Sequence, residues 1–367
     1  MSTKKRLSTA EVIENADKIF HGLRWLNGIV VCPYCGSVHI KEYDGYRYKC
    51  NSCKNRFTDR TNTIMHGSKL SVKTWLQAVH EISVDNFIPS TVLASKLGIN
   101  QKSAWLLRVK LDYCLPQDRW LLEGCIAQDE MYVGGCLSNY HYERKLRLLR
   151  SKGLLEEDRR DYTKNAIFAL NQQLKQPVFG MHDGERIVLY VTPNPVKKEY
   201  LHHIFKKHVV GDSVTVSDES ALYNDWEEVT GSKIYTNNHH NNQYKTNNNL
   251  TSNNIENTFS WFKRGFNGRI THCKYTQLYL NEFVFRYNTR HLSHIERFRM
   301  MLGETIGKHV TYKQIKAYNQ FGEYTIKTKR RRHIYTREEI RKIFDECGWL
   351  LKSITIGKTV YHREDFR

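Results

Sequence analysis

Apolar residues between positions 71 and 115 recur every three or four residues, which is the spacing of helices. Pro89 and Gly98 interrupt this pattern, so we expect separate helices joined by short turns. Ala94 lies four residues before Gly98. A small residue there lets two helices cross closely, and glycine supplies a tight turn between them. The segment 89–114 therefore predicts a helix-turn-helix, with an ordinary helical hairpin as the alternative interpretation.

A helix-turn-helix places its second helix in the major groove of DNA. We expect the small core of the motif to contain apolar side chains from both helices, namely Leu93, Leu97, Ile99, Trp105 and Leu106. The polar side chains expected to face the groove or its phosphates are Gln101, Lys102, Ser103 and Arg108.

Short, mostly apolar runs at 125–133, 176–192 and 213–218 suit strands of a mixed sheet. Within the second run, the residues MHDGER (181–186) suit a hairpin turn. The segment 142–161 between the first two runs is too charged for a core, so we expect it to cover a flank or to fold as a helical insertion. Strands with helices before and after them predict an α/β domain.

Residues 237–254 form a polar, Asn-rich segment without periodicity, which predicts a loop. A helix that contains Glu256 is expected next, followed by another helix at about 276–290. The apolar stripe of the first helix has helical spacing and is expected to pack on the sheet through Ile255, Phe259, Phe262 and Phe266.

Two capping boxes, S/T-x-x-E, predict helix starts near the ends of the chain. Ser8 with Glu11 precedes a helix expected to run through about residue 21. Thr336 with Glu339 precedes a helix expected to stop at the glycine at position 348. Between these regions the tail carries the basic run KTKRRRH, residues 327–333.

The chain has nine cysteines, of which four are spaced for a metal, namely Cys32, Cys35, Cys50 and Cys53. Two C-x-x-C knuckles separated by fourteen residues complete a closed tetrahedral Zn²⁺ site without an open position, so the expected role is structural. Residues 41–49 between the knuckles alternate as a hairpin does, which is the layout of a zinc ribbon. Two redox or accidental pairs are the alternative.

The balance of charge points to an anionic partner. The 367 residues include 57 Lys and Arg against 38 Asp and Glu, for a formal charge of +19. Such an excess favours nucleic acid, since each phosphate neutralised by a cation releases condensed counterions. The first twenty residues lack the apolar core of a signal peptide, and no stretch is long and apolar enough to span a membrane. We therefore expect an intracellular protein, in the nucleoid or cytoplasm of a bacterium or in a nucleus.

Three carboxylates stand out because of where they lie in the pattern. Asp129 lies near the end of the run 125–133, Asp218 ends another run, and Glu256 opens a helix. Acids that close an apolar strand are costly to hold there unless they bind a cation or a partner. Together the three offer oxygen ligands to two hard cations such as Mg²⁺. Two ions about 3.5–4 Å apart can activate a nucleophile and stabilise a leaving oxygen.

The neighbours of two of these acids offer competing assignments, Glu130 beside Asp129 and Glu219 beside Asp218. Because side chains alternate across a strand, we expect only one residue of each pair to face a common site. The pattern does not choose between them, and a capping or surface role is the alternative for each acid.

The order of these parts resembles that of zinc-ribbon-bearing insertion-sequence transposases with a DDE domain (the ISXO-like transposase domain), and the eukaryotic Merlin-type DNA transposases look similar. The resemblance covers about residues 20–290. The matching stretches are Cys32 to Cys53, 66–75, 89–114, DEMYVGG at 129–135, VSD at 216–218, and NIE at 254–256 through Lys263 and Arg264. A charged insertion, 136–165, replaces the short basic stretch expected there.

The resemblance implies a ribonuclease H-like mixed-sheet catalytic domain with Asp129, Asp218 and Glu256 as the triad that binds Mg²⁺ or Mn²⁺. It also selects Asp129 over Glu130, and Asp218 over Glu219. The side chains of Lys263 and Arg264 are expected near the DNA backbone.

The function implied by the resemblance is that of a DNA transposase. The zinc ribbon and the helix-turn-helix would bind terminal inverted repeats, with Lys329, Arg330 and Arg331 adding phosphate contacts. The DDE site would cleave a strand at the transposon end and join it to target DNA without a covalent enzyme intermediate. Work on two ends implies a homodimer or a higher assembly. The alternatives are a transposase-derived regulator that binds DNA without catalysis and a nuclease that cuts without joining.

The expected domains follow the same order. Residues 1–60 hold an N-terminal helix and the zinc ribbon, and 61–118 hold the helix-turn-helix. The catalytic domain is expected over 119–300, and 301–367 form a basic tail to which no role is assigned.

Overall fold

The protein is described by a computed structural model. The described residues are 14–25, 28–84, 87–134, 140–159, 161–218, 220–237, 253–266, 273–318, 323–326, 337–346, 353–356 and 359–366. The chain divides into two compact units. Unit 1 contains residues 1–116 and 281–318, and unit 2 contains residues 117–280 and 319–367.

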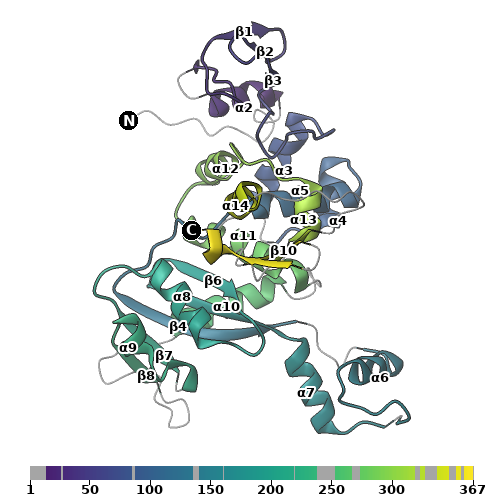
Figure 1. Ribbon diagram of the computed structural model, residues 1–367, viewed down its shortest axis with the longest axis vertical. Helices are drawn as coiled ribbons and strands as arrows, with labels where there is room; N and C mark the ends of the chain where they lie inside the picture. Colours follow the sequence, from purple (N-terminus) through teal and green to yellow (C-terminus); the bar gives the residue numbers. More distant parts are fainter. Residues whose placement is uncertain are drawn as a thin grey trace. The chain divides into compact units, whose positions relative to one another are not determined.

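Unit 1 begins with a small helix and a three-stranded sheet (Figure 1). Helix α2 spans Ala16–Arg24, and the strands are β1 (Ile40–Tyr43), β2 (Arg47–Cys50) and β3 (Arg56–Thr58). Strand β2 pairs antiparallel with both neighbours, so the hairpin predicted between the cysteine knuckles is confirmed. The core of this part consists of the buried side chains of Trp25, Cys32, Tyr48, Cys50 and Phe57.

Three helices follow, with breaks where proline and glycine predicted them. They are α3 (Val72–Val84), α4 (Ser90–Leu97) and α5 (Gln101–Tyr113). Gly98 ends α4 in the left-handed conformation at φ 63°, which glycine adopts without steric cost. The side chain of Asn100 caps α5 by accepting a hydrogen bond of 2.8 Å from the N–H of Ser103.

The small core predicted for this segment is only partly correct. Leu93 is fully buried, but Trp105 and Leu106 are only half-buried. The buried face of α5 instead contains Ala104, Leu107 and Leu111, because residues three and four apart share one face of a helix. The helix pair itself is confirmed, and its identity as a helix-turn-helix remains a prediction.

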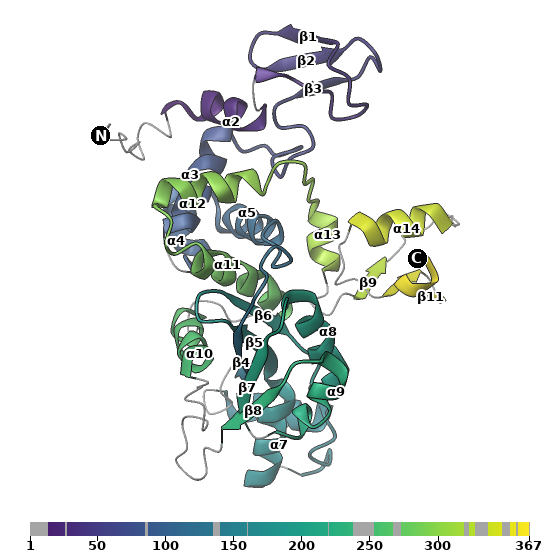
Figure 2. The ribbon, with the colours of Figure 1, turned by 90° about the vertical axis from the view of Figure 1, so that its left-hand side faces the viewer.

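Later residues complete unit 1 (Figure 2). From Asn281 onward, α11 (Thr276–Asn288) belongs to this unit, and it is followed by α12 (His294–Gly303) and α13 (Tyr312–Ala317). Helix α12 packs on α3. Both α12 and α13 begin with a complete capping box.

Unit 2 contains a five-stranded mixed sheet, so the predicted α/β architecture is confirmed. The strands are β4 (Cys125–Val133), β5 (Gln176–His182), β6 (Ile187–Val191), β7 (Val214–Asp218) and β8 (Ile234–Asn237). Their order is β6-β5-β4-β7-β8. Strands β4, β5 and β6 are antiparallel, whereas β7 and β8 run parallel to β4. The turn between β5 and β6 lies within the predicted residues 181–186.

Different helices pack on the two faces of this sheet. On one face Phe179 and Tyr190 pack in a core with helices α8 (Lys198–His208) and α9 (Trp226–Thr230). On the other face, β4 and β5 pack against α10 (Asn253–Phe266). Strands covered on both faces are expected to be apolar throughout, which explains the unbroken apolar runs in the sequence.

The expected apolar stripe of α10 is confirmed, because Ile255, Phe259, Phe262 and Phe266 are all buried. Gly180 in β5 lets the helix approach the sheet closely. A Cβ at position 180 would lie 2.6 Å from Cε1 of Phe259 and 2.8 Å from Cδ1 of Ile255. Any larger residue at this position would therefore require the neighbouring side chains to shift.

The charged segment after β4 folds as a helical insertion, which was one of its two predicted forms. It contains α6 (Tyr142–Ser151) and α7 (Lys164–Leu174), which meet in a small apolar cluster around Leu149 and Leu170.

The C-terminal part of the chain contains β9 (Glu323–Ile326), α14 (Arg337–Glu346), β10 (Ser353–Ile356), β11 (Thr359–His362) and a 3₁₀ turn at Arg363–Phe366. Strand β10 pairs parallel with β9 and antiparallel with β11. Helix α14 ends close to the predicted stop. Several predicted residues lie outside the described residues, namely Ser8, Glu11, Lys329, Arg330, Arg331 and Thr336. Among the helices that the structure describes, none combines the length and the apolar character needed to cross a membrane.

Candidate functional site

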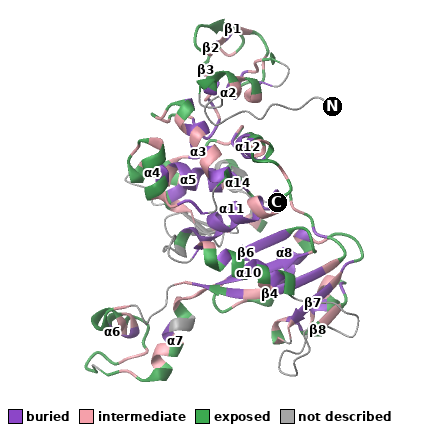
Figure 3. Ribbon diagram, turned by 180° about the vertical axis from the view of Figure 1, so that it is seen from behind, coloured by how far each residue is buried: buried purple, intermediate pink, exposed green. Residues whose placement is uncertain are grey.

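Acidic side chains meet where β4 and β7 run side by side in unit 2. The two strands pair in parallel from Cys125 with Val214 to Ala127 with Val216. Asp129 and Asp218 each lie two residues beyond the last pair, so their side chains continue the same face of two adjacent strands. Figure 3 shows β4 and β7 within the largely buried sheet. The structure thus brings together two of the three predicted catalytic acids.

Glu130 belongs to the same group of carboxylates, and the expectation that only one of two adjacent acids binds a common cation stays a prediction. One carboxylate oxygen from each of Asp129, Glu130 and Asp218 lies within 4.8 Å of the others. Side chains still alternate along β4. Asp129 pairs with Gly180, which faces α10, whereas Glu130 pairs with Phe179 and bonds to Tyr223 on the other face. Because the pairing of β4 with β7 ends at Ala127, the carboxylates of both residues can approach that of Asp218 past the strand edge. The backbone N–H of Glu130 donates a 2.7 Å hydrogen bond to Oδ1 of Asp129.

The electrostatics of this group favour a cation. The pKa of Asp129 is raised to about 7 by burial and by the negative charges of Asp218 and Glu256, while the backbone N–H of Glu130 and the charge of Lys263 act against the rise. The pKa of Glu130 is likewise raised to about 7, mainly by burial, against the lowering effect of the hydrogen bond from Tyr223. Half-buried acids that repel one another are stabilised when a positive charge lies between them.

Glu256, in the first turn of α10, affects the carboxylate of Asp129 through its negative charge. It is half-buried, and its charge is among those that raise the pKa of Asp129. Among the described residues, the set of acids within 4.8 Å of one another contains Asp129, Glu130 and Asp218, and Glu256 lies outside it. Ile255 and Phe259 of the same helix pack closely over Gly180, which brings the turn that carries Glu256 close to β5.

The donor atoms of this group fit a hard divalent cation. All of them are carboxylate oxygens, which are the protein ligands that Mg²⁺ and Mn²⁺ prefer. The choice of Asp129, Asp218 and Glu256 as the metal-binding triad remains a prediction. Glu219, the rejected alternative to Asp218, lies outside the described residues.

Four cysteines form a second candidate metal centre in unit 1. The Sγ atoms of Cys32 and Cys53 are 3.6 Å apart, as are those of Cys35 and Cys50, and all four lie within 4.8 Å of one another. Sulfur atoms around a tetrahedral zinc with Zn–S distances of about 2.3 Å are about 3.8 Å apart. The four thiols therefore fit a structural Zn²⁺, as the spacing of the knuckles predicted.

The predicted DNA contacts on α5 divide into two sets. Gln101 and Lys102 are exposed and Ser103 is half-buried, all in the first turn of the helix. Arg108 is only 2% exposed, and its guanidinium lies 2.6 Å from a carboxylate oxygen of Glu282 in α11. The expectation that Arg108 contacts DNA is therefore wrong, because a buried charge with a buried partner is unavailable to phosphate.

Two other residues predicted to contact DNA lie on α10. Lys263 and Arg264 are exposed in its last turns, and Lys263 is close enough to Asp129 to lower its pKa. Trp261 on the same helix is 50% exposed. The three predicted contacts of the basic run 327–333 lie outside the described residues.

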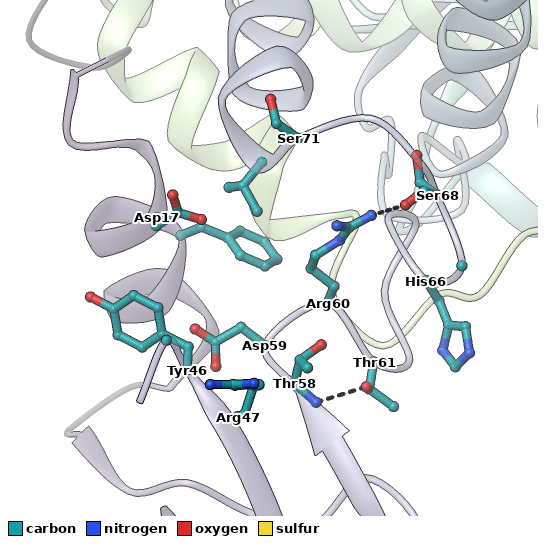
Figure 4. Close-up of a pocket in the computed structure, with 14 residues that line it drawn as sticks. Asp17, Tyr46, Arg47, Thr58, Asp59, Arg60, Thr61, His66, Ser68 and Ser71 are labelled. Carbon is teal, nitrogen blue, oxygen red and sulfur yellow. Dashed lines mark hydrogen bonds between the residues drawn. The ribbon is translucent and has the colours of Figure 1, made fainter. Parts of the chain in front are cut away.

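A cavity of about 620 Å³ lies in unit 1 beside the ribbon (Figure 4). It is lined by residues of α2, of strands β2 and β3, and of the loop that leads to α3. Two charged side chains of its wall, Asp59 and Arg60, have hydrogen-bond partners within the protein. Arg60 donates to the carbonyl of Ser68, and Asp59 accepts hydrogen bonds of 2.6 Å from Trp25 Nε1 and 2.9 Å from His21 Nδ1. These bonds tie α2 to the end of the ribbon.

The residue pattern left Glu130 open as an alternative to Asp129, and the resemblance selected Asp129. Tyr223, whose hydroxyl donates to Oε1 of Glu130, is a neighbour that the sequence did not indicate. Burial, and then the charge of Glu130, raise the pKa of Tyr223 well above its ordinary value, so the hydroxyl keeps its proton. A tyrosine five residues after Asp218 carries no signal in the sequence, because its partner is 93 residues away.

Two segments of the chain match known protein families, and both families are parts of transposases. Residues 121–288 match the ISXO2-like transposase domain, and residues 14–56 match the transposase zinc-ribbon domain. The first match contains the three predicted catalytic acids, and the second contains the four cysteines. The resemblance to zinc-ribbon-bearing insertion-sequence transposases is therefore confirmed.

A similar protein from Halobacterium salinarum bears the description "Uncharacterized protein in transposable element ISH50". It is 29% identical over 175 residues, which are 46% of this chain and 54% of that protein. The chain thus spans about half the length of the curated relative that it matches. No solved structure matches this chain.

Proposed function

We propose that this protein is a DNA transposase that cleaves and joins DNA strands at a divalent-cation site built by unit 2. The observation that carries the proposal is the meeting of Asp129, in the middle of β4, with Asp218, the last residue of β7, just beyond the point where the two parallel strands stop pairing. Numbered along the chain, the five strands lie in the order 3-2-1-4-5, with the first three antiparallel and the last two parallel to the first. We infer that this sheet is ribonuclease H-like.

The roles of the residues follow from their positions. Asp129, Asp218 and Glu256 would hold the cations, which when bound supply an activated oxygen nucleophile and neutralise charge at the scissile phosphate. Lys263 and Arg264, exposed on the helix that carries Glu256, bind phosphates of the DNA that enters this site. Hydrolysis and strand joining are both displacements at phosphorus, so one set of residues serves both.

Recognition of DNA is assigned to unit 1. The zinc ribbon and the pair α4–α5 bind the terminal inverted repeats of the mobile element. Gln101, Lys102 and Ser103 lie in the first turn of α5, which is the part of a recognition helix that reaches base edges. Because a transposition reaction needs two ends, we infer a homodimer or a higher assembly on paired DNA.

Strand transfer by the purified full chain tests the proposal. The substrate is a pre-cut duplex that carries the inverted repeat flanking the gene, supplied with Mg²⁺ or Mn²⁺ and a plasmid target. We expect joined product from the natural protein and a loss of at least 100-fold in Asp218→Asn. Asp212→Asn, at an exposed acid six residues earlier, should leave the yield unchanged.

Other results would overturn the proposal. Cut strands without joined product would indicate a nuclease that does not transfer strands. Binding of the repeat without any cut or joined product would indicate a DNA-binding regulator derived from a transposase.

A further inference from the structure

We propose that Glu130 is an additional carboxylate ligand of the divalent-cation site and that Tyr223 is the residue that positions it. This inference rests on the proposed function, because it concerns the same site. It goes beyond the triad of Asp129, Asp218 and Glu256, because Glu130 would bind the same cation as Asp129.

Proximity is the first argument for Glu130. Its carboxylate lies within 4.8 Å of those of Asp129 and Asp218, whereas Glu256 lies outside that group. Three carboxylates at this separation repel one another when ionised. A divalent cation between them removes this cost, because each oxygen then faces a positive charge.

The hydrogen bond from Tyr223 is the second argument. The Tyr223 hydroxyl donates to Oε1 of Glu130. A carboxylate can accept about four hydrogen bonds or ligand contacts, so this bond leaves Glu130 with capacity to bind a cation. Partners outside the ligand set commonly hold ligating carboxylates in this way, and they orient the oxygens toward the metal.

Tyr223 is itself held rigidly. Its side chain is 4% exposed and packs edge-on against Trp226 at 5.3 Å between ring centroids. It belongs to the 3₁₀ turn Ala221–Tyr223, which directly follows the segment of Asp218. The segment that supplies Asp218 therefore also supplies Tyr223, the hydrogen-bond donor that orients the carboxylate of Glu130.

Binding of Mn²⁺ to the full-length protein, followed by electron paramagnetic resonance and calorimetry, tests this role without any DNA. We expect Glu130→Gln to weaken Mn²⁺ binding at least tenfold, since it removes a charged ligand oxygen but keeps the shape of the side chain. Tyr223→Phe should weaken binding about 10-fold, within the range usual for outer partners of ligands. The spectrum of the bound Mn²⁺ should change in both variants.

Two matched controls exclude general effects of charge and of the tyrosine hydroxyl. Glu123→Gln removes an exposed acid two residues before β4, and Tyr132→Phe removes a hydroxyl from a side chain that is 43% exposed on the same strand. Both should bind Mn²⁺ as the natural protein does. Thermal unfolding without metal should show Glu130→Gln to be at least as stable as the natural protein, because one of three repelling charges is gone.

The outcomes separate the two proposals. If Asp218→Asn weakens Mn²⁺ binding but Glu130→Gln does not, this inference fails and the proposed function stands. If neither variant changes the affinity, the divalent-cation site itself is wrong, and the proposed function fails with it. If Glu130→Gln loses stability without metal while its Mn²⁺ affinity is unchanged, Glu130 is only a structural partner of Tyr223.

Discussion

Burial decides what an ionisable side chain of this protein can do, as Arg108 and His208 illustrate. The buried guanidinium of Arg108 in unit 1 is paired with the carboxylate of Glu282 at 2.6 Å. His208 in unit 2 is fully buried, and burial lowers its pKa to about 4. The neutral ring is well satisfied: Nδ1 donates to the carbonyl of Trp120 at 2.7 Å, and Nε2 accepts from the Tyr190 hydroxyl at 2.9 Å.

The depressed pKa of His208 predicts a loss of stability in acid. Between pH 6.5 and pH 4 the unfolded chain binds a proton at this residue and the folded chain does not, so the free energy of unfolding falls as the pH falls. The loss should approach about 3 kcal/mol near pH 4. Urea unfolding of unit 2, measured from pH 7 to pH 4, should show a shallower pH dependence for His208→Gln.

The exposed His291 provides the control for this measurement. His291→Gln should have the same pH dependence as the natural protein. An unchanged slope in His208→Gln would mean that carboxylates alone cause the acid sensitivity.

At the scale of helices and strands, the sequence predicted most elements but few of their long-range contacts. The limits of β4 and the apolar stripe of α10 follow from local spacing, and so do the breaks at Pro89 and Gly98. The pairing of Arg108 with Glu282 depends on residues 174 positions apart, and local periodicity carries no information about such a pair. The same is true of Glu130 and Tyr223, which are 93 residues apart. The sequence therefore indicated the candidate acidic residues but not the side chains that bind them.

Gly180 is the element-scale feature with the clearest consequence for the site. Gly180→Ala places a methyl group against the side chains of Phe259, Ile255 and Leu189, which have to shift. We expect α10 to shift with the rigid ring of Phe259 and to carry Glu256 with it. We expect a loss of about 1–3 kcal/mol in the free energy of unfolding. We also expect a loss of strand-transfer activity that persists under conditions where the variant is fully folded.

Gly303 in α12 is the matched control, since a Cβ there meets nothing within 4 Å. Gly303→Ala should be neutral or slightly stabilising, because alanine favours helix. Equal effects of the two substitutions on activity would contradict the proposed link between helix height and the position of Glu256.

At the scale of the whole molecule, the two candidate metal centres lie in different units and have separable roles. The ribbon core is small, consisting mainly of Trp25, Tyr48 and Phe57 around the cysteines, and a structural Zn²⁺ stabilises such a module substantially. The core of unit 2 consists of that unit's own residues. Loss of zinc should therefore unfold the ribbon and leave the carboxylate site intact.

Chelation of zinc from the full chain tests this separation. We expect one zinc per chain to be released, with new proteolytic cleavage in residues 28–60 and a loss of at least tenfold in affinity for repeat DNA. Mn²⁺ binding by unit 2 should persist. Cys50→Ser should reproduce the effect, whereas Cys125→Ser, at a half-buried cysteine of β4, should retain the zinc. Release of zinc without change in proteolysis would contradict a structural role.

The sequence of unit 1 is interrupted by that of unit 2, and this order affects how the protein folds during synthesis on the ribosome. Helix α5 emerges early, but Glu282, which neutralises Arg108, is made 174 residues later. At synthesis rates of about 5–20 residues per second, that delay is roughly 10–35 s. During this time Arg108 lacks the Glu282 carboxylate, and α5 has only the helices made before it, α3 and α4, to pack against. Unit 1, which is begun first, is completed only after the whole inserted sheet has been made.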